Sequence, residues 1–236
     1  MIQSDFNTVG ELVALAEAQH VPVHEIVLKR EMHDRERSRG EVLQEMLKNW
    51  QVMQESIVRG IQNTERSLSG MTGGDAKKLY AYRASGYMGE AAIEAAAYAV
   101  GISEVNAVMG RIVACPTAGS CGIVPAALVE LAGGTPAMIG NGTALAIKNL
   151  MGLVCDPVAG LVEVPCVKRN GFATVVAMTA ADMTMAGIRS FIPVDEVIAA
   201  MNEVGHLLPK SLRETSEAGL AVTPTAKAIE KRVYPD

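Results

Sequence analysis

The chain has 236 residues, of which 49% are hydrophobic and only 4% aromatic, and its formal net charge is −5. This length is sufficient for a well-buried core, in one domain or in two closely packed ones. The aromatic-poor composition favours packed helices over a sandwich of β-strands, and the negative charge argues against nucleic acid as a partner.

Membrane insertion and secretion are not expected. No stretch reaches the roughly 18 uncharged apolar residues of a membrane span, and the N-terminal residues lack the basic-then-apolar pattern of a signal peptide. We therefore expect a cytoplasmic protein without a membrane partner. In a reducing compartment, its four cysteines are expected to be thiols or metal ligands rather than disulfides.

Residues 1–68 are expected to form helices that serve as scaffold or as a subunit contact. Capping boxes, a Ser or Thr followed three residues later by Glu, begin the first and third of these helices. The third has apolar residues at helical spacing and is predicted to stop near Gly70. The expected helices span residues 9–19, 23–37 and 38–70.

A glycine-rich turn over residues 69–75 leads into a helix that is predicted to begin at Ala76. Backbone N–H groups at a helix start can hold a carboxylate or a phosphate. The alternative is that Asp75 is a simple N-cap. The candidate anion-binding residues are Thr72, Gly73, Gly74 and Asp75.

The stretch from Cys115 to Gly122 places hydroxyls and glycines around a proline, before an apolar helix that is predicted from about Ile123. It is a second candidate for binding the carboxylate of a substrate. Cys115 and Cys121 can equally be small buried hydrophobes. A further alternative is that Cys121 is a metal ligand. The candidate substrate-binding residues are Thr117, Gly119 and Ser120.

The central stretch, residues 148–170, contains Cys155 and Cys166, eleven residues apart. One straight helix would place both thiols on one face but about 16 Å apart, too far for one small metal centre. Prolines and a glycine make such a helix improbable. We expect a helix that ends near Val154, a tight loop over 156–160 and an extended run over 161–164, which together bring the two cysteines close.

The predicted fold is thus mainly α: a compact helical domain with a Pro/Gly-rich cysteine loop. Lys168, Arg169 and Asn170 follow the second cysteine directly and are placed to hold an anion beside the thiols. The structural alternative is that the two cysteines are buried thiols in a Pro/Gly connection. Zinc is a minor alternative, since the spacing lacks the close ligand pairs of structural zinc sites. Further helices are expected over 90–100, 174–188 and 194–208, followed by a solvated charged end.

The run GLVCDPVAGLVEVPCVKRN, residues 152–170, resembles the iron–sulfur-dependent L-serine dehydratases, also called L-serine ammonia-lyases. It is similar in particular to the separate α subunit of the two-subunit bacterial form. Residues 70–86, 104–125 and 211–225 resemble the same family in the same order. The resemblance therefore covers nearly the whole chain and implies one domain over 1–236, with the substrate and cluster region over 69–236.

This resemblance implies a lyase that deaminates L-serine to pyruvate and ammonia through an open iron of a [4Fe–4S] cluster. It implies Cys155 and Cys166 as cluster ligands, and a β-type subunit as partner, since the family's Ser-Ser-His-Thr-type motif is absent here. The family also carries several dozen further residues after the position of Leu128, among them a Gly-Cys-Gln segment with a third ligand. That segment is absent, which leaves open a non-catalytic helical partner or a decayed relative that keeps the fold but not the cluster.

Overall fold

The computed structural model describes residues 3–113 and 120–235, and for 120–123 the backbone alone. Within these residues it is 69% helical and has no strand, so the prediction of a mainly α fold is confirmed. The ten α-helices are α1 (Val9–Gln19), α2 (Val23–Asp34), α3 (Arg39–Gln62), α4 (Asp75–Tyr82), α5 (Glu90–Ala107), α6 (Ser120–Leu131), α7 (Pro136–Leu150), α8 (Cys166–Met185), α9 (Val194–Leu207) and α10 (Pro224–Val233).

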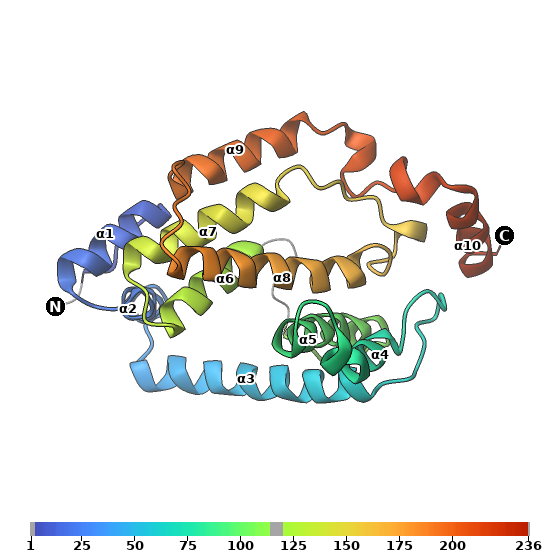
Figure 1. The fold of residues 1–236 in the computed structure, drawn as a ribbon, viewed down its shortest axis with the longest axis horizontal. Coiled ribbons are helices and arrows are strands. Elements are labelled where there is room, and N and C mark those ends of the chain that lie inside the picture. Colours follow the sequence, from blue (N-terminus) through green and yellow to red (C-terminus); the bar gives the residue numbers. More distant parts are fainter. Residues whose placement is uncertain (1–2, 114–119, 236) are drawn as a thin grey trace. The chain divides into compact units, whose positions relative to one another are not determined.

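The chain divides into two compact units (Figure 1). Unit 1 comprises Met1–Gln51, Cys115–Met151 and Val176–Glu203. Unit 2 comprises Val52–Ala114, Gly152–Val175 and Val204–Asp236. Helices α3, α8 and α9 contribute residues to both units.

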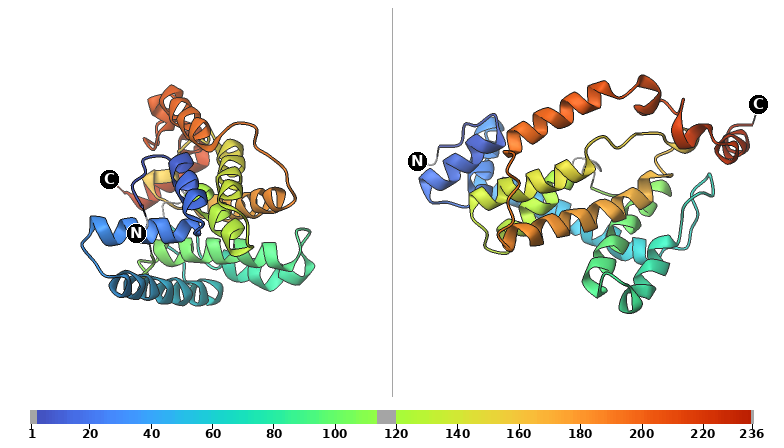
Figure 2. Two further views of the ribbon diagram at one scale, coloured as in Figure 1. Left: turned by 90° about the vertical axis from the view of Figure 1, so that its left-hand side faces the viewer. Right: turned by 45° about the horizontal axis from the view of Figure 1, so that its top comes forward.

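Unit 1 is built around the α6–α7 hairpin, whose two helices lie side by side (Figures 1 and 2). The turn between them is capped on both sides: Gly133 adopts a left-handed φ of +82°, and the Thr135 hydroxyl accepts the N–H of Met138 at 3.4 Å. Such caps satisfy backbone groups that helix ends leave unpaired. The hairpin packs with α1 and α2 around a buried cluster of Ala16, Val23, Ile26, Val129, Ile139 and Ala181.

Unit 2 contains α4 and α5, which also lie side by side (Figure 2). The second half of α3 crosses α5 where Gly60 meets Gly101, and a Cβ on Gly60 would come 2.5 Å from the Gly101 carbonyl carbon. Only glycine permits this approach of two helix backbones. Ala76, Val100 and Val167 form a small buried cluster of α4, α5 and α8.

Several predicted boundaries hold, because the signals that set them are local. Helix α1 spans the predicted residues, and its capping box of Thr8 and Glu11 is formed. The capping box of Ser38 and Glu41 is also formed, with a 2.8 Å bond from the Ser38 N–H to the Glu41 carboxylate.

Other predicted boundaries are wrong. Helix α3 ends at Gln62 rather than near Gly70, because the Asn63 side chain bonds the Glu65 N–H at 2.9 Å and so competes with the helix. Only Leu161 of the predicted extended run over 161–164 is extended, and residues 162–165 form a turn. Helix α8 begins at Cys166 instead of 174, because Pro165 stands just before the helix, where its missing N–H costs nothing. The charged end is helical over Pro224–Val233.

Candidate active site

Cys155 lies in the connection between α7 and α8, and residues 212–216 hold its backbone in place. Its N–H donates to the Leu212 carbonyl at 2.9 Å, and its carbonyl accepts the N–H of Glu214 at 2.7 Å. The carbonyl of Pro157 accepts a hydrogen bond from the Ser216 hydroxyl at 2.7 Å. The backbone around this thiol is therefore fixed by a second, distant segment of unit 2.

Asp156, next to this cysteine, is buried, with a side chain that is only 4% exposed. Its Oδ2 accepts the N–H of Leu220 at 2.7 Å. Its Oδ1 has no hydrogen-bond partner, and the nearest cation is Nη2 of Arg169 at 3.9 Å. That separation counts as an ion pair but is too long for a hydrogen bond.

Glu163 fixes the other end of the connection between α7 and α8, three residues before Cys166. Its buried Oε2 accepts the hydroxyls of Ser67 at 2.6 Å and Ser69 at 2.9 Å. Arg232 of α10 donates to the Ser69 carbonyl at 2.9 Å. These contacts tie the connection to the segment between α3 and α4, so that both ends of the cysteine connection are braced within unit 2.

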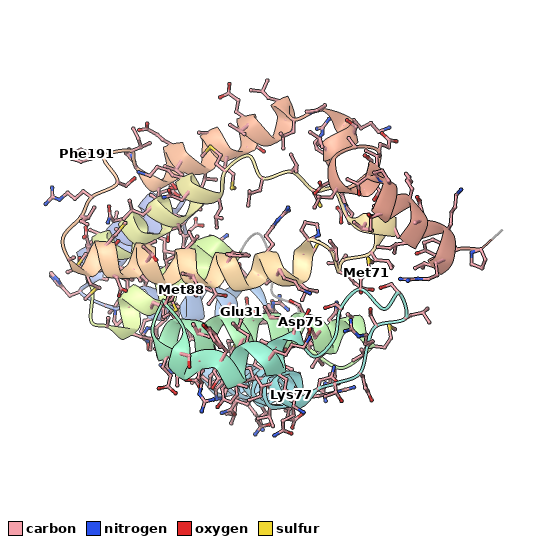
Figure 3. The ribbon with its side chains drawn as sticks, turned by 45° about the vertical axis from the view of Figure 1, so that its right-hand side comes forward. Glu31, Met71, Asp75, Lys77, Met88 and Phe191 are labelled. Carbon is pink, nitrogen blue, oxygen red and sulfur yellow. The ribbon has the colours of Figure 1, made fainter. Side chains whose placement is uncertain are left out.

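The side chains of Lys168 and Asn170, which follow Cys166 on α8, also have partners in unit 2. Nζ of Lys168 lies 2.6 Å from the carboxylate of Asp75, at the start of α4 (Figure 3). The Asn170 side chain donates to the Ser103 hydroxyl of α5 at 2.6 Å. The structure thus brings Lys168 together with one of the candidates from the glycine-rich turn.

The two thiols share their electrostatic neighbours. Both are free and partly buried, and burial is the largest effect that raises the pKa of each above the ordinary 9.0. The charge of Cys155 further raises the pKa of Cys166, while the Arg169 guanidinium lowers the pKa of both. Arg169 is itself fixed by a 2.6 Å bond from Nη1 to the Val154 carbonyl. Arg169 of α8 thus links the residue before Cys155 to the helix that begins at Cys166.

These residues fit part of an iron–sulfur site. Two thiolates beside a guanidinium are soft ligands of the kind that iron–sulfur clusters use. A cluster with one open iron takes three, and no group of three or more His, Cys, Asp or Glu side chains among the described residues is arranged to hold a metal ion. A third donor must therefore come from outside this group.

In the glycine-rich turn, the backbone amides bind a carboxylate of the protein itself. Glu104 of α5 is fully buried and accepts the N–H groups of Gly73 at 3.2 Å, Asp75 at 2.9 Å and Ala76 at 3.2 Å. The hydroxyl of Thr72 lies 3.5 Å from the same carboxylate. The start of α4 is thus an anion site, as its sequence suggests, and Glu104 is the anion that it holds.

The remaining predicted residues lie at the start of α6. Thr117 and Gly119 fall outside the described residues. Ser120 and Cys121 begin the helix, and their side chains are outside the description. None of the predicted site residues lines the cavity of about 880 Å³ in unit 1. At the rim of that cavity, Phe191 is 92% exposed and points away from the helices (Figure 3).

The sequence analysis did not identify three buried acids of unit 2, Glu104, Asp156 and Glu163. Asp156 and Glu163 lie inside the cysteine run, and an acid beside a buried thiol carries a functional signal. Nothing in the sequence distinguishes Glu104 from a solvated helix residue, because its partners lie about 30 residues away along the chain.

Comparison with known proteins identifies the family. The model of the family described as "Serine dehydratase alpha chain" matches residues 18–130 and 126–221. The chain belongs to this family. It is 38% identical to the probable L-serine dehydratase, alpha chain, of Bacillus subtilis (strain 168), over 97% of this chain and 95% of the relative.

Two further relatives have the same kind of name. The L-serine dehydratase, alpha chain, of Peptoniphilus asaccharolyticus is 31% identical, over 95% of this chain and 97% of the relative. L-serine dehydratase TdcG of Escherichia coli (strain K12) is 29% identical over 92% of this chain, but only 62% of that relative is matched. No helix of the described residues is long and apolar enough to cross a membrane.

The comparison also locates an internal difference from the family. The alignment with the Bacillus relative covers 287 positions, whereas this chain has only 236 residues, so at least 51 positions have no counterpart here. The two blocks of the family model meet at residues 126–130, inside α6. Helix α6 therefore contains the point at which the two matched blocks of the family model meet.

Proposed function

We propose that this chain is the α subunit of a two-subunit enzyme that deaminates L-serine to pyruvate and ammonia. The observation that carries the proposal is the 2.6 Å bond from Arg169 of α8 to the Val154 carbonyl, which links the residue before Cys155 to the helix that begins at Cys166. Cys155, Cys166 and Arg169 all lie in the second block that the family model matches. The relatives in that family have names that specify L-serine dehydratase.

The cofactor that we propose is a [4Fe–4S] cluster, with Cys155 and Cys166 as two of its ligands and Cys121 as the candidate third. Removing water from serine expels hydroxide, a poor leaving group, from the β-carbon. An open iron, when bound, would supply a Lewis acid that polarises the hydroxyl. The eliminated aminoacrylate then tautomerises and is hydrolysed to pyruvate and ammonia.

The protein's own part is to hold the amino acid in place. Arg169 is 31% exposed beside the thiols and presents a planar cation suited to a carboxylate. Lys168, which directly precedes Arg169, forms a partly exposed ion pair with Asp75 of α4. The substrate-binding residues that we propose are Asp75, Thr117, Gly119, Ser120, Lys168, Arg169 and Asn170. Thr72, Gly73 and Gly74 are buried, and Thr72 and Gly73 already contact the Glu104 carboxylate.

We propose a β-type subunit as the partner, because the name "alpha chain" of the relatives implies a second chain. The cytoplasm is the proposed location, since a reducing compartment keeps free thiols available to iron. The test is to produce this chain together with a β subunit, reconstitute the complex without oxygen from iron and sulfide, and measure pyruvate formed from L-serine.

The expected result is pyruvate formation by the wild-type complex, lost in Cys155→Ser and in Cys166→Ser. Cys115→Ser is the matched control, because it removes the same group from a cysteine outside the proposed ligand set, and it should retain activity. An inactive wild-type complex, or active Cys155→Ser and Cys166→Ser complexes, would contradict the proposal.

A second candidate function is a non-catalytic helical partner that keeps the fold without the cluster. The positions missing inside α6 favour it, because the family's third ligand lies in that part of the sequence. It predicts that the double variant Cys155→Ala, Cys166→Ala binds the β subunit with unaltered affinity, and that neither form makes pyruvate. Intact-mass measurement of the protein from its source would reveal a longer native chain.

A further inference from the structure

One oxygen of the Asp156 carboxylate, Oδ1, is buried and accepts no hydrogen bond. Its side chain is 4% exposed, and Oδ1 is the one buried side-chain nitrogen or oxygen of the described residues without a hydrogen bond. Buried polar atoms in folded proteins are almost always paired. An exception next to a candidate reactive group points to a partner that arrives with a ligand.

The other buried acids of unit 2 have no such vacancy. Glu163 accepts the hydroxyls of Ser67 and Ser69. The Glu104 carboxylate accepts three backbone N–H groups at 2.9 to 3.2 Å. Among the described residues, only Asp156 has a fully buried carboxylate oxygen without a hydrogen bond: Oδ2 accepts the Leu220 N–H, and Oδ1 accepts none.

Arg169 offers the complementary charge. Its Nη1 donates to the Val154 carbonyl, and its Nη2 lies 3.9 Å from Oδ1 of Asp156. Asp156 and Arg169 therefore form an ion pair that contains no hydrogen bond. Cys155 lies within reach of both charges, since both act on the pKa of its thiol. An α-amino acid carries the matching pair, an ammonium and a carboxylate on one carbon.

We propose that Asp156 and Arg169 form a subsite for zwitterionic amino acids, in which Oδ1 of Asp156 accepts a hydrogen bond from the α-ammonium group. Arg169 donates to the α-carboxylate of the same molecule. The inference rests on the proposed function and deepens it, because it assigns selection for a free amino group to a named atom. A hydroxy acid without the ammonium leaves Oδ1 buried and unpaired, which disfavours its binding.

The test measures binding to the complex of this chain with a β subunit by calorimetry without oxygen, before iron and sulfide are added, so that L-serine is not consumed. The two probes are L-serine and 3-hydroxypropanoate, which lacks only the amino group. The wild-type complex should bind L-serine at least about 10-fold more tightly than 3-hydroxypropanoate, the difference expected for a charge-assisted hydrogen bond.

Asp156→Asn keeps an oxygen that can accept the Leu220 N–H but removes the charge. It should weaken L-serine binding at least about 10-fold and change 3-hydroxypropanoate binding less than about 2-fold. Glu214→Gln is the matched control: it removes an exposed charge that also acts on both thiols, and it should leave the preference for L-serine unchanged.

Three results would overturn the inference alone: equal loss of both probes in Asp156→Asn, unchanged L-serine binding in that variant, or loss of the preference in Glu214→Gln instead. If Asp156→Asn does not fold, the wild-type complex alone tests the subsite. Equal dissociation constants for L-serine and 3-hydroxypropanoate would then reject it. A wild-type complex that binds neither probe would overturn this inference, and pyruvate formation by the reconstituted complex decides the proposed function separately.

Discussion

Gly219 lies against the Asp156 carboxylate with no room for a side chain. Its φ is +63°, and a Cβ built on it would overlap Oδ2 of Asp156. We expect Gly219→Ala to lower the free energy of unfolding by about 2–4 kcal/mol, because left-handed strain and a clash act together. Urea unfolding followed by circular dichroism measures this loss.

Gly160 provides the control, because it has a similar φ of +67° and open space where a Cβ would be. Gly160→Ala carries the left-handed strain alone and should cost about 1 kcal/mol. Equal losses in the two variants would show that Gly219 does not position Asp156.

Glu104 is the second residue whose neighbours are specific enough for a prediction. Its carboxylate accepts N–H groups from Gly73, Asp75 and Ala76, and water does not reach it. Glu104→Gln turns one acceptor into a donor that faces N–H groups, so we expect a loss of about 2–3 kcal/mol in unfolding free energy. Glu94→Gln on the same helix removes a carboxylate bonded only by the Tyr98 hydroxyl and should cost less than about 1 kcal/mol. A smaller loss for Glu104→Gln than for Glu94→Gln would contradict the assignment.

At the scale of elements, the ion pair of Asp75 and Lys168 joins the first turns of α4 and α8. Partial burial raises the pKa of Asp75, but the Lys168 and Lys78 ammoniums lower it by more, so that it lies below the ordinary 3.8. A carboxyl with a depressed pKa stabilises the folded state above its unfolded pKa, and this contribution is lost as the pH falls through the folded value.

We therefore expect the difference in unfolding free energy between wild type and Asp75→Asn to be constant from pH 7 to about 5, to decrease as the pH falls below about 4, and to vanish only below the depressed folded pKa of Asp75. Lys77→Ala, which removes a lysine of α4 outside this pair, should show no such pH dependence. A difference that persists undiminished at low pH would mean that the Asn variant acts through packing and not through the charge.

The convergence of Cys155 and Cys166 can be tested without any cluster. A trivalent arsenical such as phenylarsine oxide bridges two thiols only when their sulfurs are adjacent. In a chain with Ser at positions 115 and 121, we expect one arsenical per chain, and none after Cys155→Ser or Cys166→Ser, by intact mass. Unmodified protein in the two-thiol form would contradict the convergence.

The start of a helix can be predicted from the sequence where the residues that signal it are close together in the chain. The start of α1 was predictable, since Thr8 and Glu11 signal it within four residues. The start of α8 was missed, because Pro165 was interpreted as a helix breaker when it stands just before the first helical residue. The assignment of Cys155 and Cys166 to one site stays a prediction from motif and spacing. The role of Glu104 was not, since its partners are fixed only by the packing of α4 on α5.

At the scale of the whole molecule, the chain is helical at the point where the two matched blocks of the family model meet. Residues 126–130, where the two blocks of the family model meet, lie in one continuous helix, and Val129 within it is fully buried. Gly133 and Thr135 then cap the turn to α7.

The most direct test is the iron and sulfide content of the oxygen-free reconstituted complex with a β subunit. We expect about four irons and four sulfides per α chain, with a broad visible absorbance, and neither in Cys155→Ser nor in Cys166→Ser, while Cys115→Ser retains both. Equal iron contents in all four proteins, or none in the wild type, would contradict the claim that Cys155 and Cys166 hold one iron–sulfur centre.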